Sequence, residues 1–176
     1  AYPVDKVYRF GGSEFTNRGW NILMAKITAE EKARKQQALN EIVLEIFWNE
    51  GWQAVSYAEV AKRFGTTKSA IQRYFPSHDH FALALQGKVM PLITSHLDWS
   101  SKEKFIESWM TALTNNEDLR FRKVLELLFI ESTKETASQM SLVGVERFTG
   151  KIKETFGDES VSNELFGRTF IYLLNN

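Results

Sequence analysis

The chain of 176 residues is most constrained by two short helical patterns that flank Gly65. Ahead of this glycine, apolar residues recur at the spacing that places them on one face of a helix: Tyr57, Val60, Ala61 and Phe64. Ser56 and Glu59 have capping-box spacing, which predicts that the first helix opens at Ser56. Gly65 then offers the left-handed conformation that commonly ends a helix.

A second helix is predicted immediately after this glycine. Thr66 and Thr67 are good N-caps, and inward-facing residues follow at helical spacing: Ala70, Ile71, Tyr74 and Phe75. Pro76 stops the helix, because it disfavours the helical conformation for Phe75 and has no N–H to donate. Two helices joined by so short a turn cross at a steep angle. The stretch therefore predicts a helix-turn-helix, a motif whose second helix lies in the major groove of DNA.

The outward face of the second helix carries polar and basic side chains: Lys68, Ser69, Gln72 and Arg73. These residue types contact phosphates and base edges in protein–DNA complexes. Solvated helix faces carry the same types, so this face by itself leaves both a DNA contact and an ordinary surface open.

The segment IQRYFPSHDHF, residues 71–81, with Gly-Thr-Thr ahead of it, resembles the N-terminal domain of the TetR/AcrR family of bacterial transcription regulators. The positions that agree with the family pattern are Tyr74, Phe75, Ser77, Asp79 and Phe81. Gln72 departs from it by replacing a common tyrosine, and His78 by replacing a common lysine. An imidazole, whose charge depends on pH, thus replaces a permanent positive charge. The resemblance covers about a third of the chain, from about Arg34 to Val89.

The resemblance implies an all-α protein with a three-helix DNA-binding domain over residues 24–90 and a helical effector-binding and dimerisation bundle over 91–176. The first helix is predicted over Thr28–Glu50 from cap spacing and apolar period. A fourth helix is predicted over Ser77–Met90, capped by Ser77 and ended or kinked at Pro91. The pattern from Leu92 onward is helical throughout.

Residues 1–23 are expected to be irregular, because they contain Pro3 and the pair Gly11-Gly12. Met24 looks like a start of translation, which makes this stretch either an extension of the natural protein or an artificial leader. An arm that enters the minor groove stays open as an alternative.

The expected DNA contacts follow from the outward face and the resemblance. Base edges are assigned to Lys68, Ser69 and Gln72, and Gln72 is suited to adenine. Thr67 begins the same helix and belongs to the same predicted interface. Phosphate contacts are assigned to a wider set: Ser56, Arg73, Tyr74 and His78.

The bundle carries two further hypotheses. A cavity for a small apolar or aromatic effector would be lined by Trp109, Met110, Phe121, Leu125, Phe129, Met140 and Phe148. The same residue types fill ordinary cores, and it is the resemblance that favours the cavity. A homodimer, which the family usually forms through its last helices, would use Phe156, Leu165, Phe166, Phe170 and Tyr172.

Composition narrows the function classes. The formal net charge is zero, yet the stretch 56–75 holds four basic residues and one acid. This local excess on a neutral chain is typical of a reader of short DNA sites joined to another domain. The chain has no cysteine, no membrane-spanning run and no signal-peptide pattern, which favours a cytoplasmic, nucleoid-associated protein. His78 and His80 diverge on a helix, and no catalytic motif is present, so no metal site, cofactor or enzyme activity is expected.

The sequence therefore predicts a homodimeric transcription repressor that binds a palindromic DNA operator and is modulated by a small molecule. One alternative is a chromosome-bound interaction protein whose bundle recruits a protein partner. Another is a small-molecule binder whose DNA-binding role is vestigial.

Overall fold

The structure is a computed structural model that describes residues 7–176, with side chains described from Thr28 onward and at several positions of 7–16. Residues 1–6 of the expected irregular stretch lie outside the described residues. The chain forms two compact units, Ala1–Glu41 and Ile42–Asn176, and each is considered by itself.

The first unit contains a β-hairpin and the beginning of a long helix. Strand β1, Val7–Phe10, pairs antiparallel with β2, Ser13–Thr16. Gly11 and Gly12 have φ of 59° and 85°, and positive φ at both turn positions is the geometry of a two-residue hairpin loop. The expectation of irregular structure is therefore wrong for residues 7–23, because the glycine pair is a hairpin turn and a helix follows it directly.

Helix α1 runs from Asn17 to Glu50, so it begins eleven residues before the predicted start at Thr28. The cap spacing of Thr28 and Glu31 was misleading, because no proline precedes it to keep the helix from starting earlier. In the part of α1 that belongs to the second unit, Val43, Ile46 and Phe47 are fully buried. The helix ends before Gly51, whose φ is 90°.

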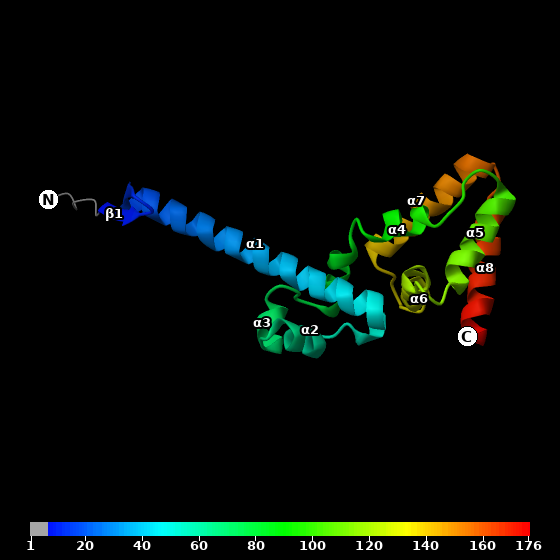
Figure 1. The fold of residues 1–176 in the computed structure, drawn as a ribbon, viewed down its shortest axis with the longest axis horizontal. Helices are drawn as coiled ribbons and strands as arrows, with labels where there is room; N and C mark the ends of the chain where they lie inside the picture. Colours follow the sequence, from blue (N-terminus) through cyan, green and yellow to red (C-terminus); the bar gives the residue numbers. More distant parts are fainter. Residues whose placement is uncertain (1–6) are drawn as a thin grey trace. The chain divides into compact units, whose positions relative to one another are not determined.

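The head, residues 52–85, follows α1. It comprises the 3-10 turn η1 (Trp52–Ala54), helices α2 (Tyr57–Phe64) and α3 (Lys68–Gln72), and the 3-10 segment η2 (His78–Leu85). Helices α2 and α3 pack against each other (Figure 1). The core of the head includes Ile71 from α3 together with Phe75 and Phe81, whose ring centroids are 4.6 Å apart.

The predicted fourth helix, Ser77–Met90, is wrong in three respects. The chain forms η2 and then α4, Val89–Ser95, with Gly87 at φ 72° in the link between them. Ser77 does not cap by its side chain, because its hydroxyl bonds to His80 Nδ1 at 2.7 Å. Pro91 lies in the first turn of α4, where a missing N–H leaves no helical hydrogen bond unmade.

The bundle is formed by α4 and four longer helices: α5 (Lys102–Thr114), α6 (Arg120–Ser132), α7 (Gln139–Phe156) and α8 (Ser160–Asn175). Helix α5 lies beside α8 and also packs on α6, while α7 packs on α8 (Figure 1). Trp109 on α5 donates from Nε1 to Thr169 Oγ1 on α8 at 2.9 Å, with both residues buried. Apart from the hairpin, the described chain is helical, and the predicted all-α class is confirmed.

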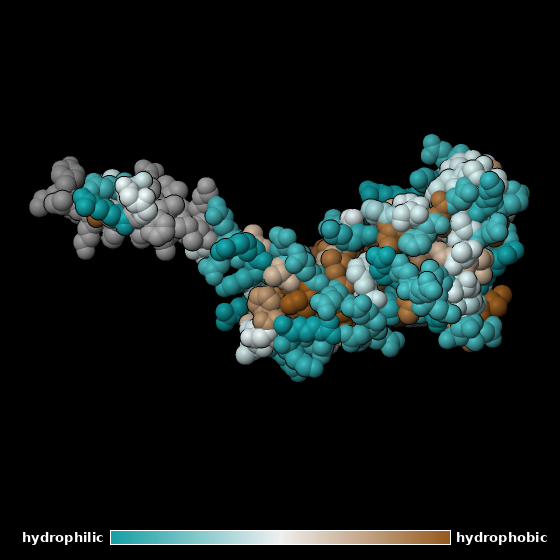
Figure 2. All heavy atoms as spheres, in the orientation of Figure 1, coloured by the Kyte–Doolittle hydropathy of each residue, from teal (hydrophilic) through white to brown (hydrophobic). Residues whose placement is uncertain are grey.

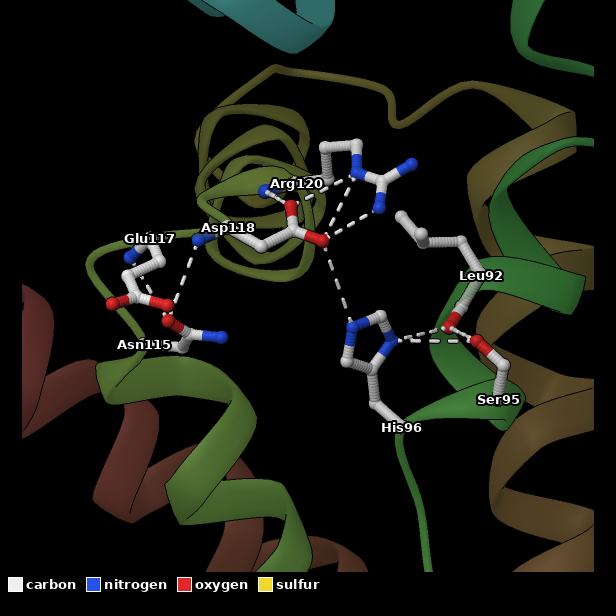
Figure 3. Close-up of polar contacts among 7 residues, drawn as sticks. All are labelled: Leu92, Ser95, His96, Asn115, Glu117, Asp118 and Arg120. Carbon is white, nitrogen blue, oxygen red and sulfur yellow. Dashed lines mark hydrogen bonds and ion pairs between the residues drawn. The ribbon is translucent and has the colours of Figure 1, made fainter.

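The loop between α5 and α6 is tied to the end of α4 by a polar cluster (Figure 3). Asp118 accepts hydrogen bonds from the Arg120 side chain, with the nearest at 2.6 Å, and from the Arg120 backbone N–H at 3.1 Å. These bonds lower the pKa of Asp118 to about 2. His96 donates from Nδ1 to Leu92 O at 2.8 Å, and its Nε2 lies 3.9 Å from the Asp118 carboxylate.

Seen from one side, hydrophilic atoms cover most of the surface, and hydrophobic atoms show in its middle part and beside the C-terminal end of α8 (Figure 2). Within residues 7–176, no helix combines the length and hydropathy needed to cross a bilayer.

Candidate nucleic-acid interface

Helix α2 is closed at both ends by the residues that the sequence pattern indicated. The Ser56 hydroxyl accepts the Glu59 backbone N–H at 3.2 Å. Gly65 adopts φ 73° and ψ 40°, and its N–H donates to Lys62 O while that of Thr66 donates to Ala61 O at 2.9 Å. This pair of bonds is a Schellman motif, which fixes the direction in which the chain leaves α2.

Helix α3 starts three residues beyond this glycine, at Lys68. Thr67 is its N-cap, and the Thr67 hydroxyl accepts the Ala70 N–H at 3.3 Å. The α-helix proper ends at Gln72, short of the predicted end at Phe75, although the N–H groups of Tyr74 and Phe75 still donate to Ile71 O. Because Ile71 and Phe75 are buried, the opposite side of α3 faces solvent.

The crossing of the two helices is held by a hydrogen bond that the sequence reasoning missed. Tyr57, the first residue of α2, donates from its hydroxyl to Phe75 O at 2.7 Å. Its ring centroid lies 5.0 Å from that of Phe81, and burial raises the pKa of the Tyr57 hydroxyl. The apolar period had placed Tyr57 on the inward face without indicating a partner for its polar end.

We call the solvent-facing side of α3 the reading face. It consists of five exposed residues: Thr67, Lys68, Ser69, Gln72 and Arg73. Tyr74 and Ser56, also predicted to contact DNA, are half-buried at its edges. Within residues 7–176 neither Lys68 nor Arg73 forms an ion pair, so both cations stand ready for an external anion.

Arg63, another basic side chain of the stretch 56–75, is already neutralised by carboxylates of the subunit. It bonds to Glu59 Oε1 at 2.9 Å, to Glu45 Oε1 at 3.4 Å and to Glu50. The bonds to Glu59 and Glu50 raise the pKa of Arg63. Arg63 thus connects α2 to the end of α1. Glu45 and Glu50 lie outside the stretch 56–75, so they were not counted in its predicted positive charge. Their pairing with Arg63 makes the net positive charge at this surface smaller than predicted.

His78 has a structural contact of its own. Its Nε2 donates to Val55 O at 2.7 Å, and its ring is edge-on to Trp52 at 5.4 Å and to Phe81 at 5.5 Å. The residue is exposed, but only Nδ1 is left to bond an external phosphate. The predicted phosphate contact of His78 is therefore limited to one ring nitrogen.

The bundle contains two neighbouring cavities. The larger cavity, about 620 Å³, is lined by four residues of the predicted effector set: Trp109, Leu125, Met140 and Phe148. The smaller cavity, about 470 Å³, is lined by Leu125 and by Phe129, also of that set. Met110 and Phe121 line neither, and Phe121 is fully buried against the Trp109 ring at 5.1 Å. Phe121 therefore has a packing role instead of the predicted effector contact, and the effector contact of Met110 stays a prediction.

The larger cavity also has walls that the sequence reasoning missed. Leu83 and Leu85 of η2 and Val89, Met90 and Ile93 of α4 line it. The predicted connecting helix Ser77–Met90 contained the first four of these residues but not Ile93, and the break at Gly87 separates the five residues into two elements on the same cavity.

The predicted dimer residues have different environments in the subunit. Leu165 is fully buried, so we remove it from the predicted dimer surface. Phe156 packs on Phe105 at 5.1 Å, and Phe166 packs on Trp109 at 6.1 Å. Tyr172 lies under the Arg122 guanidinium at 5.5 Å.

The exposed apolar surface of α8 lies at its C-terminal end. Phe170, Ile171 and Leu174 are 50%, 62% and 69% exposed, and hydrophobic atoms show beside this end of the helix (Figure 2). Ile171 and Leu174 were not in the predicted set, because their side of α8 was not distinguished from the inner one.

Two family models match the chain, one after the other. Residues 44–85 match the family described as bacterial regulatory proteins, tetR family, and this range ends with η2. Residues 86–173, half of the chain, match the tetracycline repressor LuxT C-terminal domain. The boundary between the two matches lies at the link between η2 and α4.

Curated relatives match over part of their length. The chain is 29% identical over 82 residues to the nucleoid occlusion factor SlmA of Glaesserella parasuis serovar 5, which is 47% of this chain and 41% of that protein. It is 30% identical over 73 residues to the nucleoid occlusion factor SlmA of Haemophilus ducreyi, which is 42% of this chain and 36% of that protein. The chain thus spans about two-fifths of the length of these relatives.

Proposed function

Because the chain belongs to the tetR family of bacterial regulatory proteins, we propose that it is a transcription repressor that binds a palindromic operator as a homodimer. The observation that carries the proposal is the reading face. It offers three uncharged polar side chains and two cations that form no ion pair among the described residues, on a helix whose other side is anchored by Ile71 and Phe75. A rigid, exposed and polar helix of this kind suits insertion into the major groove.

The residues of the reading face have separate roles in this proposal. Lys68, Ser69 and Gln72 contact base edges, and Thr67 supports them at the start of α3. Arg73 contacts phosphate, assisted by residues at the edge of the head: Ser56, Tyr74 and His78. The capped turn at Gly65 and the Tyr57 bond keep this face at a fixed angle to α2, which base readout requires.

The rest of the chain supplies pairing and control. Two copies meet through the exposed apolar end of α8 around Phe170, which would bury surface that is otherwise in water. A small effector binds in the larger cavity and shifts the balance between two arrangements of the paired heads. The protein then acts in the cytoplasm, on the nucleoid, as a regulator rather than an enzyme.

Selection of bound duplexes from a random DNA pool tests the DNA-binding part. We expect a palindromic consensus with half-sites about one helical turn apart or more. Gln72→Ala is expected to relax the preference at one base pair by about 1–3 kcal/mol, while Arg73→Ala weakens binding to all sequences alike.

Lys153→Ala is the matched control for lost positive charge, because Lys153 lies on α7 and pairs with Glu159. Identical effects of Gln72→Ala and Arg73→Ala across the site library would contradict the division of roles. Loss of affinity in Lys153→Ala equal to that in Arg73→Ala would show that only net charge matters.

The similarity to nucleoid occlusion factors favours a second candidate function. Here the head holds the protein on the chromosome, and the bundle recruits a protein partner. Repeating the DNA selection at two salt concentrations separates the candidates, because binding without sequence preference is dominated by phosphates and is steeply salt-dependent. A consensus together with effector-dependent release supports the repressor. Sequence-blind binding, or a consensus that no small molecule affects, supports the second candidate.

A further inference from the structure

We propose that the larger cavity takes an amphipathic anion, a molecule with an apolar body and one carboxylate-like end. The proposal names the chemical class of the effector and in that respect rests on the proposed function. The chemical class follows from the walls and charges of the cavity and does not depend on DNA binding.

The walls accept an apolar body. Most of the lining residues are apolar, including Ile93, Leu128 and Phe148. A volume of about 620 Å³ is in the range of cavities that enclose small organic ligands. Transfer of a hydrocarbon chain from water to such walls is favourable by about 0.8 kcal/mol per methylene.

One side of the cavity carries two positive charges. Arg147 and Lys151 both line it, and they are one turn apart on α7. The Lys151 ammonium lies 4.3 Å from the centroid of the Trp99 ring, which holds it in place by a cation–π contact. Like charges at this spacing repel each other, so an anion bound between them relieves a cost that the free protein carries.

Among the described residues, no carboxylate pairs with Arg147 or Lys151. The lining of the larger cavity includes neither Asp nor Glu, and among residues 7–176 neither Arg147 nor Lys151 forms an ion pair. The smaller cavity is the opposite case, because Glu131 and Glu146 line it. An anionic end is therefore directed to the larger cavity, and a neutral or cationic end has no carboxylate to meet there.

Binding to the full chain tests the class with three probes of equal chain length: decanoate, decan-1-ol and decylamine, each kept below the concentration at which it aggregates. Titration calorimetry is expected to show decanoate binding at least about tenfold more tightly than decan-1-ol, a difference of about 1.4 kcal/mol, with decylamine weakest. Equal affinity for the three probes, or no binding of decanoate, would overturn the proposal.

The double variant Arg147→Gln with Lys151→Gln tests the charges. Its affinity for decanoate is expected to fall to that for decan-1-ol, while decan-1-ol binding stays unchanged. Lys153→Gln, on the same helix but outside the cavity lining, is the control and should leave the preference intact. A preference that survives in the double variant would contradict the role of these cations.

The cavity itself is tested at two glycines of α7. A Cβ added at Gly144 or at Gly150 meets nothing within 4 Å, but only Gly144 lines the larger cavity. Gly144→Leu is expected to abolish binding of both decanoate and decan-1-ol, and Gly150→Leu to leave both unchanged. Equal behaviour of the two variants would show that the probes bind elsewhere.

The outcome is separable from that of the proposed function. DNA selection is performed on ligand-free protein and does not involve the cavity. Decanoate binding by these rules without a DNA consensus would leave the ligand class standing and remove the repressor. A DNA consensus without selective decanoate binding would support the repressor and remove the proposed ligand class.

Discussion

The head and the bundle are each stabilised by hydrogen bonds, but the residues that these bonds join are separated by different distances along the chain. In the head, the hydrogen bonds that cap α2 join residues three to five positions apart, at Ser56 and at the Schellman turn of Gly65, while the Tyr57–Phe75 bond that holds the crossing of α2 and α3 spans eighteen positions. In the bundle, Trp109 finds its partner Thr169 sixty positions along the chain. The ends of α2 and the start of α3 are therefore specified locally, whereas the crossing of these helices and the cavity of the bundle depend on residues that are distant in the chain.

The largest effect is expected where the bundle relies on its long-range bond. Trp109→Phe removes the bond to Thr169 and leaves a gap in a fully buried site, so we expect a loss of about 2–3 kcal/mol in the free energy of unfolding. Urea denaturation followed by circular dichroism measures this loss.

Trp99→Phe is the matched control for that change. Trp99 also lies among aromatic rings, 4.5 Å from Phe105, but its Nε1 is buried with no hydrogen-bond partner in the described part of the chain. The substitution removes an unsatisfied donor, which offsets part of the lost packing, so a loss below about 1 kcal/mol is expected. Equal losses at the two tryptophans would mean that ring packing alone, and not the bond to Thr169, stabilises the bundle.

A smaller effect is expected at the local turn of the head. Gly65→Ala forces a side chain into the left-handed conformation, with nothing within 4 Å of the new Cβ, so the cost is purely conformational and about 1 kcal/mol. Hydrogen exchange of amides in α2 and α3, compared with those of α5 and α8, shows whether the loss is confined to the head. Affinity for the selected operator should fall with it.

Gly150→Ala is the same substitution, but it is expected to raise the free energy of unfolding instead of lowering it. Gly150 lies inside α7 with open space around it, so alanine is expected to stabilise the helix by up to about 1 kcal/mol.

The exchange experiment on Gly65→Ala can also contradict the comparison of the two regions. If the substitution accelerated exchange in α5 and α8 as much as in α2 and α3, the head and the bundle would unfold as one unit.

The range of the interactions also determines which features of the structure could be predicted from the sequence. The cap of Ser56, the end at Gly65, the N-cap of Thr67 and the exposure of the reading face all follow from spacing within about ten residues. Local spacing could not show that the Arg63 charge is already paired, because its partners Glu45 and Glu50 come from α1. Contacts to DNA and between subunits stay predictions.

In the bundle and at the N-terminus, local patterns misled for identifiable reasons. Phe121 and Leu165 have the residue type expected of a cavity wall or a dimer face, but their burial depends on which helix packs against them. The break at Gly87 was hidden by a continuous apolar stripe that suits either one helix or two. The Gly11-Gly12 pair is ambiguous between a loop and a hairpin until the flanking residues are seen to pair.

An effect similar in size to that at Gly65, but dependent on pH, is expected at the cluster around Asp118, which joins α4 to α6 and combines short-range and long-range contacts (Figure 3). Its folded-state pKa of about 2 lies below the usual value of a free aspartate, so Asp118 adds stability above about pH 4 that is lost as the pH falls towards 2. The shift corresponds to about 2 kcal/mol, and partial exposure of Asp118 and Arg120 reduces the expected contribution to about 1 kcal/mol.

Asp118→Asn should therefore lower the free energy of unfolding by about 1 kcal/mol at pH 7 and by nothing near pH 2, as measured by urea denaturation at both values. Glu117→Gln removes the same charge from the neighbouring exposed position and is the control for net charge. The Asp118 carboxylate also faces His96 at the end of α4, so a local, two-residue contact with Arg120 is joined here to a contact across helices. If Asp118→Asn costs the same at both pH values, the acid dependence does not come from this carboxylate. The link between α4 and α6 would then depend on packing.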